Sequence, residues 1–465
     1  MDASFLFPSA VQGLLLTLLA YVTLRSASRS RKRYPPGPNG LPFIGNALQI
    51  PPDRQWLKWH EWKKGYGDII RITVLGQPAI ILSSLKIAND FLETRGSIYS
   101  DRPIAVMAGE LVGWNRGLGY ASTAHNPRFR EFRRLFHQFI GPRACATKEL
   151  QDTQERENLR LLGKLLDDPA HFADHAREYV FDILHYSATF IWISISYRRS
   201  VKIAEDAMLG FAQASGQGGW WVDSFPILKH IPAWFPGGYF KRIAAKMRED
   251  LDRLYDVPYD YAKRERCKGI SSFVSVYLDE KKGTPTLEEE ELVKAAAASL
   301  YSGGAETSPP AINSFLLAMT LYTSVQYRAK AEIEAHLSRD SSKVLPTLTD
   351  RDALPYITAV MLEVWRWNPS VPLAWYYLGL PHLVTQDDEY QEYYIEKGTV
   401  VWANIWSILH EEQNFPDPFE FKPERYLNAS GKLRTGKGEP SETVSIAFGL
   451  GRRLCPGLYL AENSV

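Results

Sequence analysis

One cysteine of the 465-residue chain lies in a sequence context that suits iron chemistry. Cys455 is part of the segment FGLGRRLCPG, which runs from Phe448 to Gly457. The glycines of this segment, among them Gly449, permit a tight loop whose N–H groups approach a thiolate closely. Arg453 stands two residues before the sulfur, where its guanidinium can neutralise a carboxylate of a bound cofactor. The pattern favours a thiolate ligand for iron over the alternative, a buried structural cysteine in a glycine-rich turn.

A second group of residues suits proton transfer. Residues 303–308 read GGAETS and lie in a helix that we expect over residues 287–323. The Glu306 carboxylate and the Thr307 hydroxyl can hold and pass on protons. The prolines at 309–310 lack N–H donors, so they free carbonyl groups one turn earlier. Two structural alternatives are a helix kink without catalytic meaning and a Thr307 hydroxyl that bonds back to the carbonyl of Gly303.

These segments, in this order, resemble the motifs of one family. Residues 448–457 are similar to the haem-binding loop of the cytochrome P-450 family, and residues 303–308 are similar to its oxygen-binding groove. Glu363 and Arg366 match its ExxR motif and would share one helix face. Residues 421–426, FKPERY, resemble its PERF segment. The resemblance covers nearly the whole chain and extends to membrane-bound fungal members; outside that order and spacing, an ExxR pair is an ordinary solvated helix pair.

The resemblance implies a haem group whose iron takes Cys455 as its axial ligand. It assigns the other matching positions to three tasks: cofactor binding, proton delivery to oxygen, and support of the core behind the haem. The cofactor-binding positions are Arg133, His382, Phe448, Gly449, Arg453 and Gly457. The proton-delivering pair is Glu306 and Thr307. The supporting charge triad is Glu363, Arg366 and Arg425.

The implied activity is that of a monooxygenase of fungal secondary metabolism, which inserts one oxygen atom of O2 into a small apolar substrate. The chain resembles no flavin or nicotinamide domain, so electrons would come from NADPH through a separate NADPH-cytochrome P-450 reductase on the same membrane. Residues that could offer this partner a basic face are Lys432, Arg434, Lys437 and Arg452. For the first three, a merely solvated loop is the alternative. Two alternatives stay open: a haem-thiolate isomerase or dehydratase, and a catalytically inactive, membrane-anchored family member.

The sequence departs from the family pattern at three places. Phe129 stands where the family has a tryptophan, four residues before Arg133. Residues 374–378, AWYYL, are inserted in a segment that lines the haem pocket of relatives. The chain ends at Val465, ten residues after Cys455, which is under three helical turns. We therefore expect a C-terminally short product, for which haem retention and activity have to be tested directly.

The N-terminal segment predicts a membrane anchor. Residues 4–24 carry no charge, and as a helix they would span roughly 30 Å, the thickness of a bilayer core. Five basic residues follow within residues 25–33, which places the body of the protein in the cytosol; a cleaved signal peptide and a buried helix are the alternatives. We expect a single-pass protein of the endoplasmic reticulum membrane. Its parts would be an anchor (1–24), a basic and proline-rich linker (25–40) and a haem-thiolate monooxygenase domain (41–465).

Composition and periodicity predict one mainly helical domain with small β-sheet regions, preceded by the transmembrane helix. Lys and Arg number 54 and Asp and Glu 53, and this net charge of +1 predicts no nucleic-acid partner. The three scattered cysteines argue against a disulfide framework. The aromatic stretch at 220–240 is either a buried loop or a surface that enters the membrane interface. Helices are expected at 130–140, 155–166, 240–254, 287–323 and 353–367, and strands at 69–73, 78–82, 393–395 and 400–402.

Overall fold

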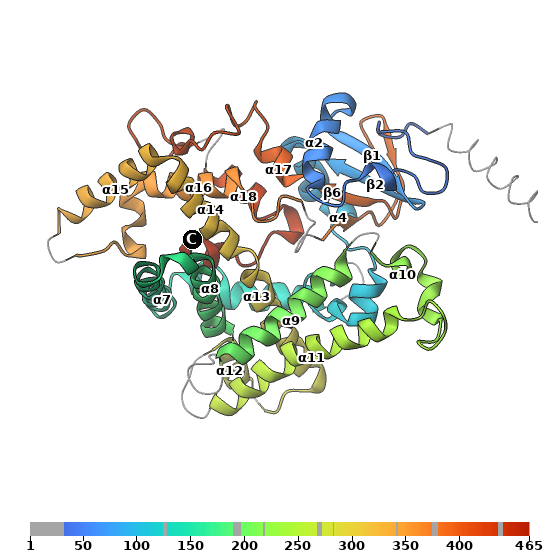
Figure 1. Cartoon of the computed structure of the whole chain (residues 1–465), viewed down its shortest axis with the longest axis horizontal. Coiled ribbons are helices and arrows are strands. Elements are labelled where there is room, and N and C mark those ends of the chain that lie inside the picture. The colour runs from blue at the N-terminus through green and yellow to red at the C-terminus, as the bar shows by residue number, and fades with distance from the viewer. Residues whose placement is uncertain are drawn as a thin grey trace, which may run out of the picture.

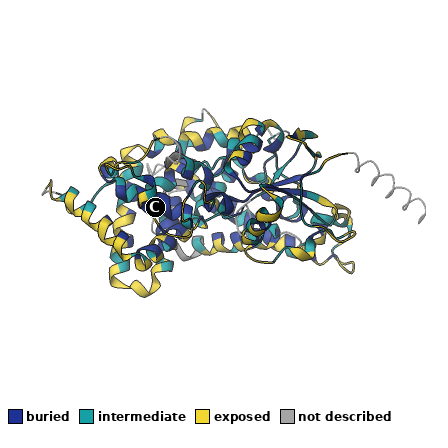
Figure 2. Cartoon of the chain, turned by 90° about the horizontal axis from the view of Figure 1, so that it is seen from above, coloured by how far each residue is buried: buried dark blue, intermediate teal, exposed yellow. Residues whose placement is uncertain are grey.

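The computed structural model describes residues 32–123, 128–188, 197–216, 219–266, 272–281, 283–340, 343–373, 380–435 and 440–464. Most of these residues are helical; the main sheet and α2 lie at one end of the molecule and α15 lies at the other (Figure 1). Buried residues occupy the middle of the molecule (Figure 2). The longer helices are α2 (Gln55–Tyr66), α5 (Arg128–Ile140), α7 (Lys148–Asp167), α8 (Phe172–Ala188), α9 (Tyr197–Ser215), α11 (Phe240–Glu265), α12 (Phe273–Glu280), α13 (Leu287–Ala305), α14 (Ser308–Leu321), α15 (Thr323–Leu337), α16 (Pro355–Trp367) and α18 (Pro440–Ala447).

Two small sheets complete the domain. The larger has the strand order β1-β2-β6-β3 and the smaller pairs β4 with β5. The strands are β1 (Ile69–Val74), β2 (Gln77–Leu82), β3 (His382–Leu383), β4 (Asp388–Tyr390), β5 (Tyr393–Ile395) and β6 (Val400–Ala403). The β1–β2 hairpin turns at Gly76, which has a φ of +84° that favours glycine. All four expected strands are confirmed, and the fold is mainly helical with small sheets, as predicted.

Helix α13 runs through the helical part of the domain and packs against α5, α8, α11 and α12. Its alanines at 295–298 are buried, and these small side chains allow neighbouring helices to approach closely. At its end, a Cβ on Gly304 would lie 2.7 Å from the side chain of Leu184 in α8. A larger residue at 304 would force the Leu184 side chain to move, so α8 forms a tight wall beside the last turn of α13.

The helix expected over residues 287–323 is not continuous. Helix α13 ends at Ala305 and α14 begins at Ser308. Prolines 309 and 310 cannot donate the hydrogen bonds that an unbroken helix requires, but they are tolerated in the first turn of a new helix, where N–H groups have no partner. The chain therefore breaks at Glu306 and Thr307, the two residues expected to act on protons. The other expected helices agree with the structure within a few residues, except that α7 begins earlier, at Lys148, and α11 continues past Pro258 to Glu265.

Residues 35–38 of the predicted linker lie along the larger sheet. The N–H group of Arg71 in β1 donates to the carbonyl of Pro36 at 2.8 Å. A Cβ on Gly37 would lie 1.9 Å from the Arg71 carbonyl oxygen, so this contact requires glycine. The proline-rich segment is thus packed against β1 and is more than a stiff spacer.

Across the described ranges, no helix is long and apolar enough to cross a bilayer. The predicted anchor at residues 4–24 lies outside those ranges, as do Cys267, Lys437 and the insertion at 374–378. The anchor and the domain boundaries drawn around it stay predictions.

Candidate active site

A cavity of about 320 Å³ lies where the segments predicted to do chemistry meet. Cys455 and Arg453 enter its wall from the loop before the last short helix, α19 (Leu458–Ser464). Arg133 enters from α5, and Thr307 enters from the break between α13 and α14. Apolar side chains of α8 and α9 line much of the rest, namely Val180, Ile183, Leu184, Met208 and Phe211. The predicted iron ligand and the predicted hydroxyl group therefore face one shared space.

Main-chain contacts that require glycine shape the loop around Cys455. The N–H group of Cys455 donates to the Phe448 carbonyl at 2.9 Å, which closes the loop on itself. Gly451 has a φ of +65°, and a Cβ there would lie 2.0 Å from the carbonyl oxygen of Leu92. Gly449 has a φ of +89°. Side chains other than hydrogen are strained or excluded at these positions, so the backbone itself holds the sulfur in place.

The two cysteines within the described residues differ in their surroundings. Burial raises the pKa of the Cys455 thiol, and the N–H group of Gly457 and the guanidinium of Arg133, which favour the thiolate, offset only part of that rise. Burial raises the pKa of Cys145 to about 12, and its thiol donates to the carbonyl of Ile140 at 3.4 Å. Cys145 does not line the cavity. It is therefore a structural, unreactive cysteine.

Three half-buried guanidinium groups line the cavity, those of Arg102, Arg133 and Arg453. Burial lowers the pKa of each guanidinium, to about 10 for Arg102 and to about 8 for Arg453. The positive charges of Arg102 and Arg133 lower the pKa of Arg453 further. Their N–H groups donate to main-chain carbonyls, as Arg453 Nε does to Ser100 at 2.9 Å. Carbonyl dipoles orient these groups but do not neutralise a full charge. The wall therefore needs an anionic partner.

The charges of this wall fit the two propionates of a haem group. The carboxylate that acts on Arg102 and Arg453 is that of Asp101, which is buried and accepts a hydrogen bond from the Thr123 N–H at 2.9 Å. The exposed Arg452 also lines the cavity, so the positive charges among the described residues here outnumber the single carboxylate. Two propionates would offset this positive excess through charge-assisted hydrogen bonds. Together with Cys455 as the iron ligand, this wall is suited to haem.

The structure places His382 outside the cavity wall, although the resemblance implies a propionate contact. Its Nδ1 is hydrogen-bonded to the Tyr99 carbonyl at 2.9 Å. Burial and the guanidiniums of Arg102 and Arg453 hold its pKa well below the usual range, so the imidazole is neutral and contributes no positive charge. Arg102 lines the cavity instead. Sequence reasoning missed Arg102, whose one signal was its place in the run YSDRP at 99–103.

The predicted proton-delivering pair is divided between two environments. Thr307 lines the cavity, and its hydroxyl donates to the Gly303 carbonyl at 2.9 Å. Glu306 has an exposed side chain and is not among the residues that line the cavity. Desolvation of its carboxyl raises the pKa of Glu306. The positive charge of Arg177 opposes this rise, and the negative charge of Glu205 adds to it. At the break, Thr307 thus lines the cavity and Glu306 does not.

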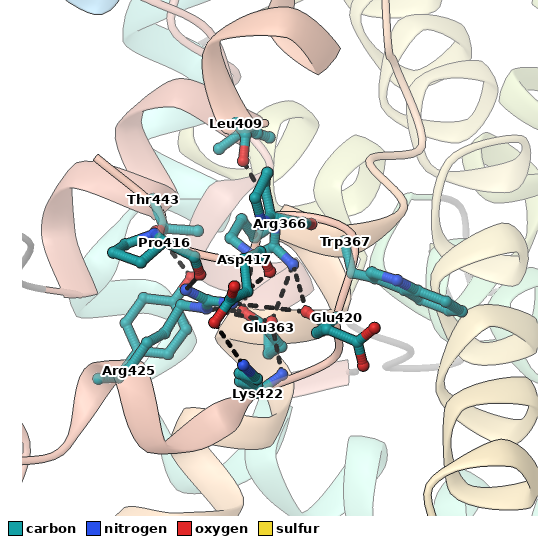
Figure 3. A network of polar contacts seen from close by, with 12 residues as sticks. Glu363, Arg366, Trp367, Leu409, Pro416, Asp417, Glu420, Lys422, Arg425 and Thr443 are labelled. Carbon is teal, nitrogen blue, oxygen red and sulfur yellow. Dashed lines mark hydrogen bonds and ion pairs between the residues drawn. The ribbon is translucent and has the colours of Figure 1, made fainter. Parts of the chain in front are cut away.

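The predicted charge triad comes together in the interior, as Figure 3 shows. Glu363 and Arg366 are each 0% exposed, and Arg366 binds both carboxylate oxygens at 2.8 and 2.9 Å. Arg425 approaches the same carboxylate at 3.0 Å, and the N–H group of Lys422 donates to it at 2.8 Å. Arg366 also donates to the Pro418 carbonyl at 2.7 Å. The Glu363–Arg366 pair is fully buried and Arg425 completes it from a half-buried position, which excludes the solvated helix pair.

Aromatic contacts connect the triad and α5 to the cavity. Trp365, which lies between the two ExxR residues, packs edge-to-face on Phe448 with a centroid distance of 4.9 Å. Phe448 lines the cavity and accepts the hydrogen bond that closes the cysteine loop. Phe129, the residue that replaces the expected tryptophan, has the Arg453 guanidinium 4.3 Å from its ring centroid. The substitution loses an N–H donor but keeps a cation–π contact.

Comparison with known proteins points to a single protein family. Residues 35–465 match the family described as cytochrome P-450. The chain is 39% identical to cytochrome P-450 monooxygenase 208 of Postia placenta over 100% of this chain and 88% of that protein. It is 39% identical to cytochrome P-450 monooxygenase claR of Ampulloclitocybe clavipes over 97% of this chain and 81% of that protein. It is 35% identical to tryptamine 4-monooxygenase of Psilocybe cyanescens over 97% of this chain and 87% of that protein.

Replacing Cys455 by alanine should abolish the reduced, CO-bound spectrum of a thiolate-ligated haem, because the iron loses its sulfur ligand. The matched variant Cys145→Ala removes a buried sulfur outside the cavity. It should keep that spectrum and lower only the thermal stability. The measurement is the CO difference spectrum of both variants at equal protein concentration. A thiolate-type spectrum from Cys455→Ala would refute the assignment of the ligand.

Replacing Arg133 by leucine should weaken haem retention, because one of the three half-buried cations of the wall is lost. A charge-assisted hydrogen bond contributes about 1.5–3 kcal/mol, so the dissociation constant for haem should rise roughly 10- to 100-fold. Arg130→Leu changes the same charge on the exposed side of α5 and should have little effect. Transfer of haem to an excess of a haem-scavenging protein measures both. Equal losses from the two variants would show that net charge alone matters.

Proposed function

Because the chain belongs to the cytochrome P-450 family, we propose that it inserts one oxygen atom of O2 into a small, neutral and largely apolar molecule. Membership makes the chain a haem-thiolate monooxygenase. The proposed electron source is NADPH, through a separate reductase. The observation that supports the proposal is the single cavity that Cys455 and Thr307 both line.

The chain's own residues divide the work around the cofactor. Cys455 would hold the iron, and Arg102, Arg133 and Arg453 would hold the propionates. Haem, when bound, supplies the O2 and electron-transfer chemistry. The apolar side chains of α8 and α9 exclude water from the reacting region. Thr307 donates its own proton to the Gly303 carbonyl, so its oxygen is free to accept a hydrogen bond from the cavity side and to position a proton there.

The lining of the cavity supports a neutral substrate with flat apolar surface. Trp114 and Phe211 pack edge-to-face at 4.7 Å, and Tyr120 lies beside Phe211 at 6.2 Å. The Tyr120 hydroxyl is hydrogen-bonded to Ser215 at 2.9 Å, which holds its ring in place. No carboxylate lines the cavity among the described residues. Tryptamine, the substrate in the name of the Psilocybe relative, is a cationic amine near neutral pH, so this chain is suited to a different, uncharged substrate.

We also propose that the body of the protein rests on the cytosolic face of the endoplasmic reticulum membrane. An exposed group of large apolar residues, here called the aromatic patch, supports this placement. Its members are Trp221, Phe225, Ile227, Trp234, Phe235 and Tyr239, which are 46% to 82% exposed. Trp and Tyr favour the interface between lipid and water. The patch would hold the domain beside the anchor predicted at residues 4–24.

Exposed basic residues are the proposed contact for the reductase. Lys432, Arg434 and Arg452 all have exposed side chains. Arg452 lines the same cavity as Cys455, so a partner bound at Arg452 would lie close to that cavity. Opposite charges on the partner would steer its approach in a salt-dependent manner.

Replacing Thr307 by alanine tests the proposed proton role. Product formed per NADPH consumed should fall at least about tenfold, with hydrogen peroxide taking up the difference, because general acid catalysis contributes 10²-fold or more. Haem content and substrate binding should persist. Thr320→Ala is the matched control, since the Thr320 hydroxyl bonds back to the Leu316 carbonyl at 2.8 Å in the same way but on an exposed face of α14. Unchanged coupling with lowered thermal stability in Thr307→Ala would leave only a structural role.

The aromatic patch should bind membranes without the anchor. In a variant that lacks residues 1–31, Ile227→Ser combined with Trp234→Ser should lower binding to phosphatidylcholine vesicles more than about tenfold, because each large apolar side chain contributes about 1.5–3 kcal/mol on burial. Leu166→Ser combined with Leu287→Ser removes two side chains that are each 84% exposed outside the patch. This control should bind as the parent does. Equal binding of all three proteins in vesicle sedimentation would disprove the membrane contact of the patch.

A further inference from the structure

The helix break leaves Thr307 without the support of a regular helix. Its N–H group donates to the Gly304 carbonyl at 3.3 Å, a tightened turn, and its hydroxyl donates to the Gly303 carbonyl at 2.9 Å. Both contacts stay within the end of α13. The next helix begins at Ser308 and opens with prolines that donate nothing backward. Something outside the two helices is therefore needed to fix the orientation of this peptide unit.

Ser370 supplies such a contact. Its hydroxyl donates to the carbonyl oxygen of Thr307 at 2.7 Å. Ser370 lies after the end of α16, more than sixty residues further along the chain, and its neighbour Val371 lines the same cavity as Thr307. The bond therefore joins two walls of the cavity at the point where the helix is broken.

The segment that carries Ser370 is itself held firmly. The Asn368 N–H donates to the Val364 carbonyl at 3.1 Å, which continues the hydrogen bonding of α16. The Trp406 N–H donates to the Pro372 carbonyl at 2.8 Å, and Leu373 is 1% exposed. The ion pairs of Glu363 with Arg366 and Arg425 hold helix α16 in place. Ser370 is thus a fixed point against which the break can be set.

We infer that Ser370 is a positioning residue that orients Thr307 toward the cavity. A hydrogen bond to the Thr307 carbonyl fixes the plane of the peptide that follows Thr307, and through it the backbone angles that direct the hydroxyl. Without this bond, only the contacts to Gly303 and Gly304 would hold Thr307, so the peptide that follows it would be less restrained. The inference rests on the proposed role of Thr307 for its catalytic consequence, but the physical hold is measurable by itself.

Amide hydrogen exchange in the full-length resting protein tests the hold directly. Ser370→Ala should speed exchange at residues 304–308 and at Ala311 by roughly two- to tenfold, the effect of one neutral hydrogen bond. Ser370→Thr keeps the donor and should restore the slow exchange. The matched control is Asn368→Ala, which removes the other bridge between the same elements, the bond from Asn368 Nδ2 to Ser314 at 2.8 Å. It should leave the exchange at 304–308 unchanged. If Ser370→Ala does not fold, Ser370→Cys, a weak donor of similar size, takes its place.

Coupling tests the catalytic consequence. Ser370→Ala should lower product per NADPH by roughly two- to tenfold and raise hydrogen peroxide correspondingly, whereas Asn368→Ala and Ser370→Thr should couple as the parent does. Unchanged exchange in Ser370→Ala would overturn the inference. Unchanged coupling in Ser370→Ala, while Thr307→Ala uncouples, would also overturn it and leave the proposed function standing. Unchanged coupling in Thr307→Ala would instead overturn the proposed proton role, and the exchange data would still decide whether Ser370 holds the break.

Discussion

A carboxylate with no exposure to solvent must be paired, and the pairing of Glu363 sets the frame of this site. Its partners Arg366 and Arg425 come from α16 and from the segment before α18, so the charge cannot be satisfied unless these two parts meet. Once α16 is fixed in this way, Trp365 packs against Phe448 on the side of the sulfur. The residues after α16 carry Ser370 to the helix break. One buried ion cluster therefore fixes the positions of segments on both sides of the cavity.

The cationic wall couples the cofactor to the stability of the chain. Burial lowers the pKa of Arg102, Arg133 and Arg453, which means that their charged forms lie in an unfavourable environment that Asp101 offsets only in part for Arg102 and Arg453. Two propionates would favour the charged forms of all three. Haem binding would then return part of the free energy that the burial of these cations costs, so cofactor affinity would be coupled to the folding of the wall.

Local motifs were predictable from the sequence, whereas orientation was not. The hairpin at Gly76, the glycine loop at Cys455 and the ExxR pair follow from residues close together in the chain, whose backbone limits and helix spacing are general. The direction of Glu306 and the enclosure of His382 depend on how α8, α9 and the arginines pack around them. Arg102 was missed because its place in the cavity comes from main-chain carbonyls at Leu380 and Pro381, far away in sequence. The prolines after Ser308 did predict an interruption of the helix, but whether it is a kink or a break depends on tertiary contacts.

The replacement of the expected tryptophan by Phe129 illustrates which property of a side chain the site needs. Burial leaves the Arg453 guanidinium short of solvation, and an aromatic face 4.3 Å from it returns part of that loss through the quadrupole of the ring. Phenylalanine and tryptophan both present such a face, so the substitution preserves the support of the cation while giving up a hydrogen-bond donor. A leucine of similar volume would keep the packing but not the electrostatic contact. The cation at Arg453 therefore requires an aromatic ring at residue 129 and not the indole of tryptophan in particular.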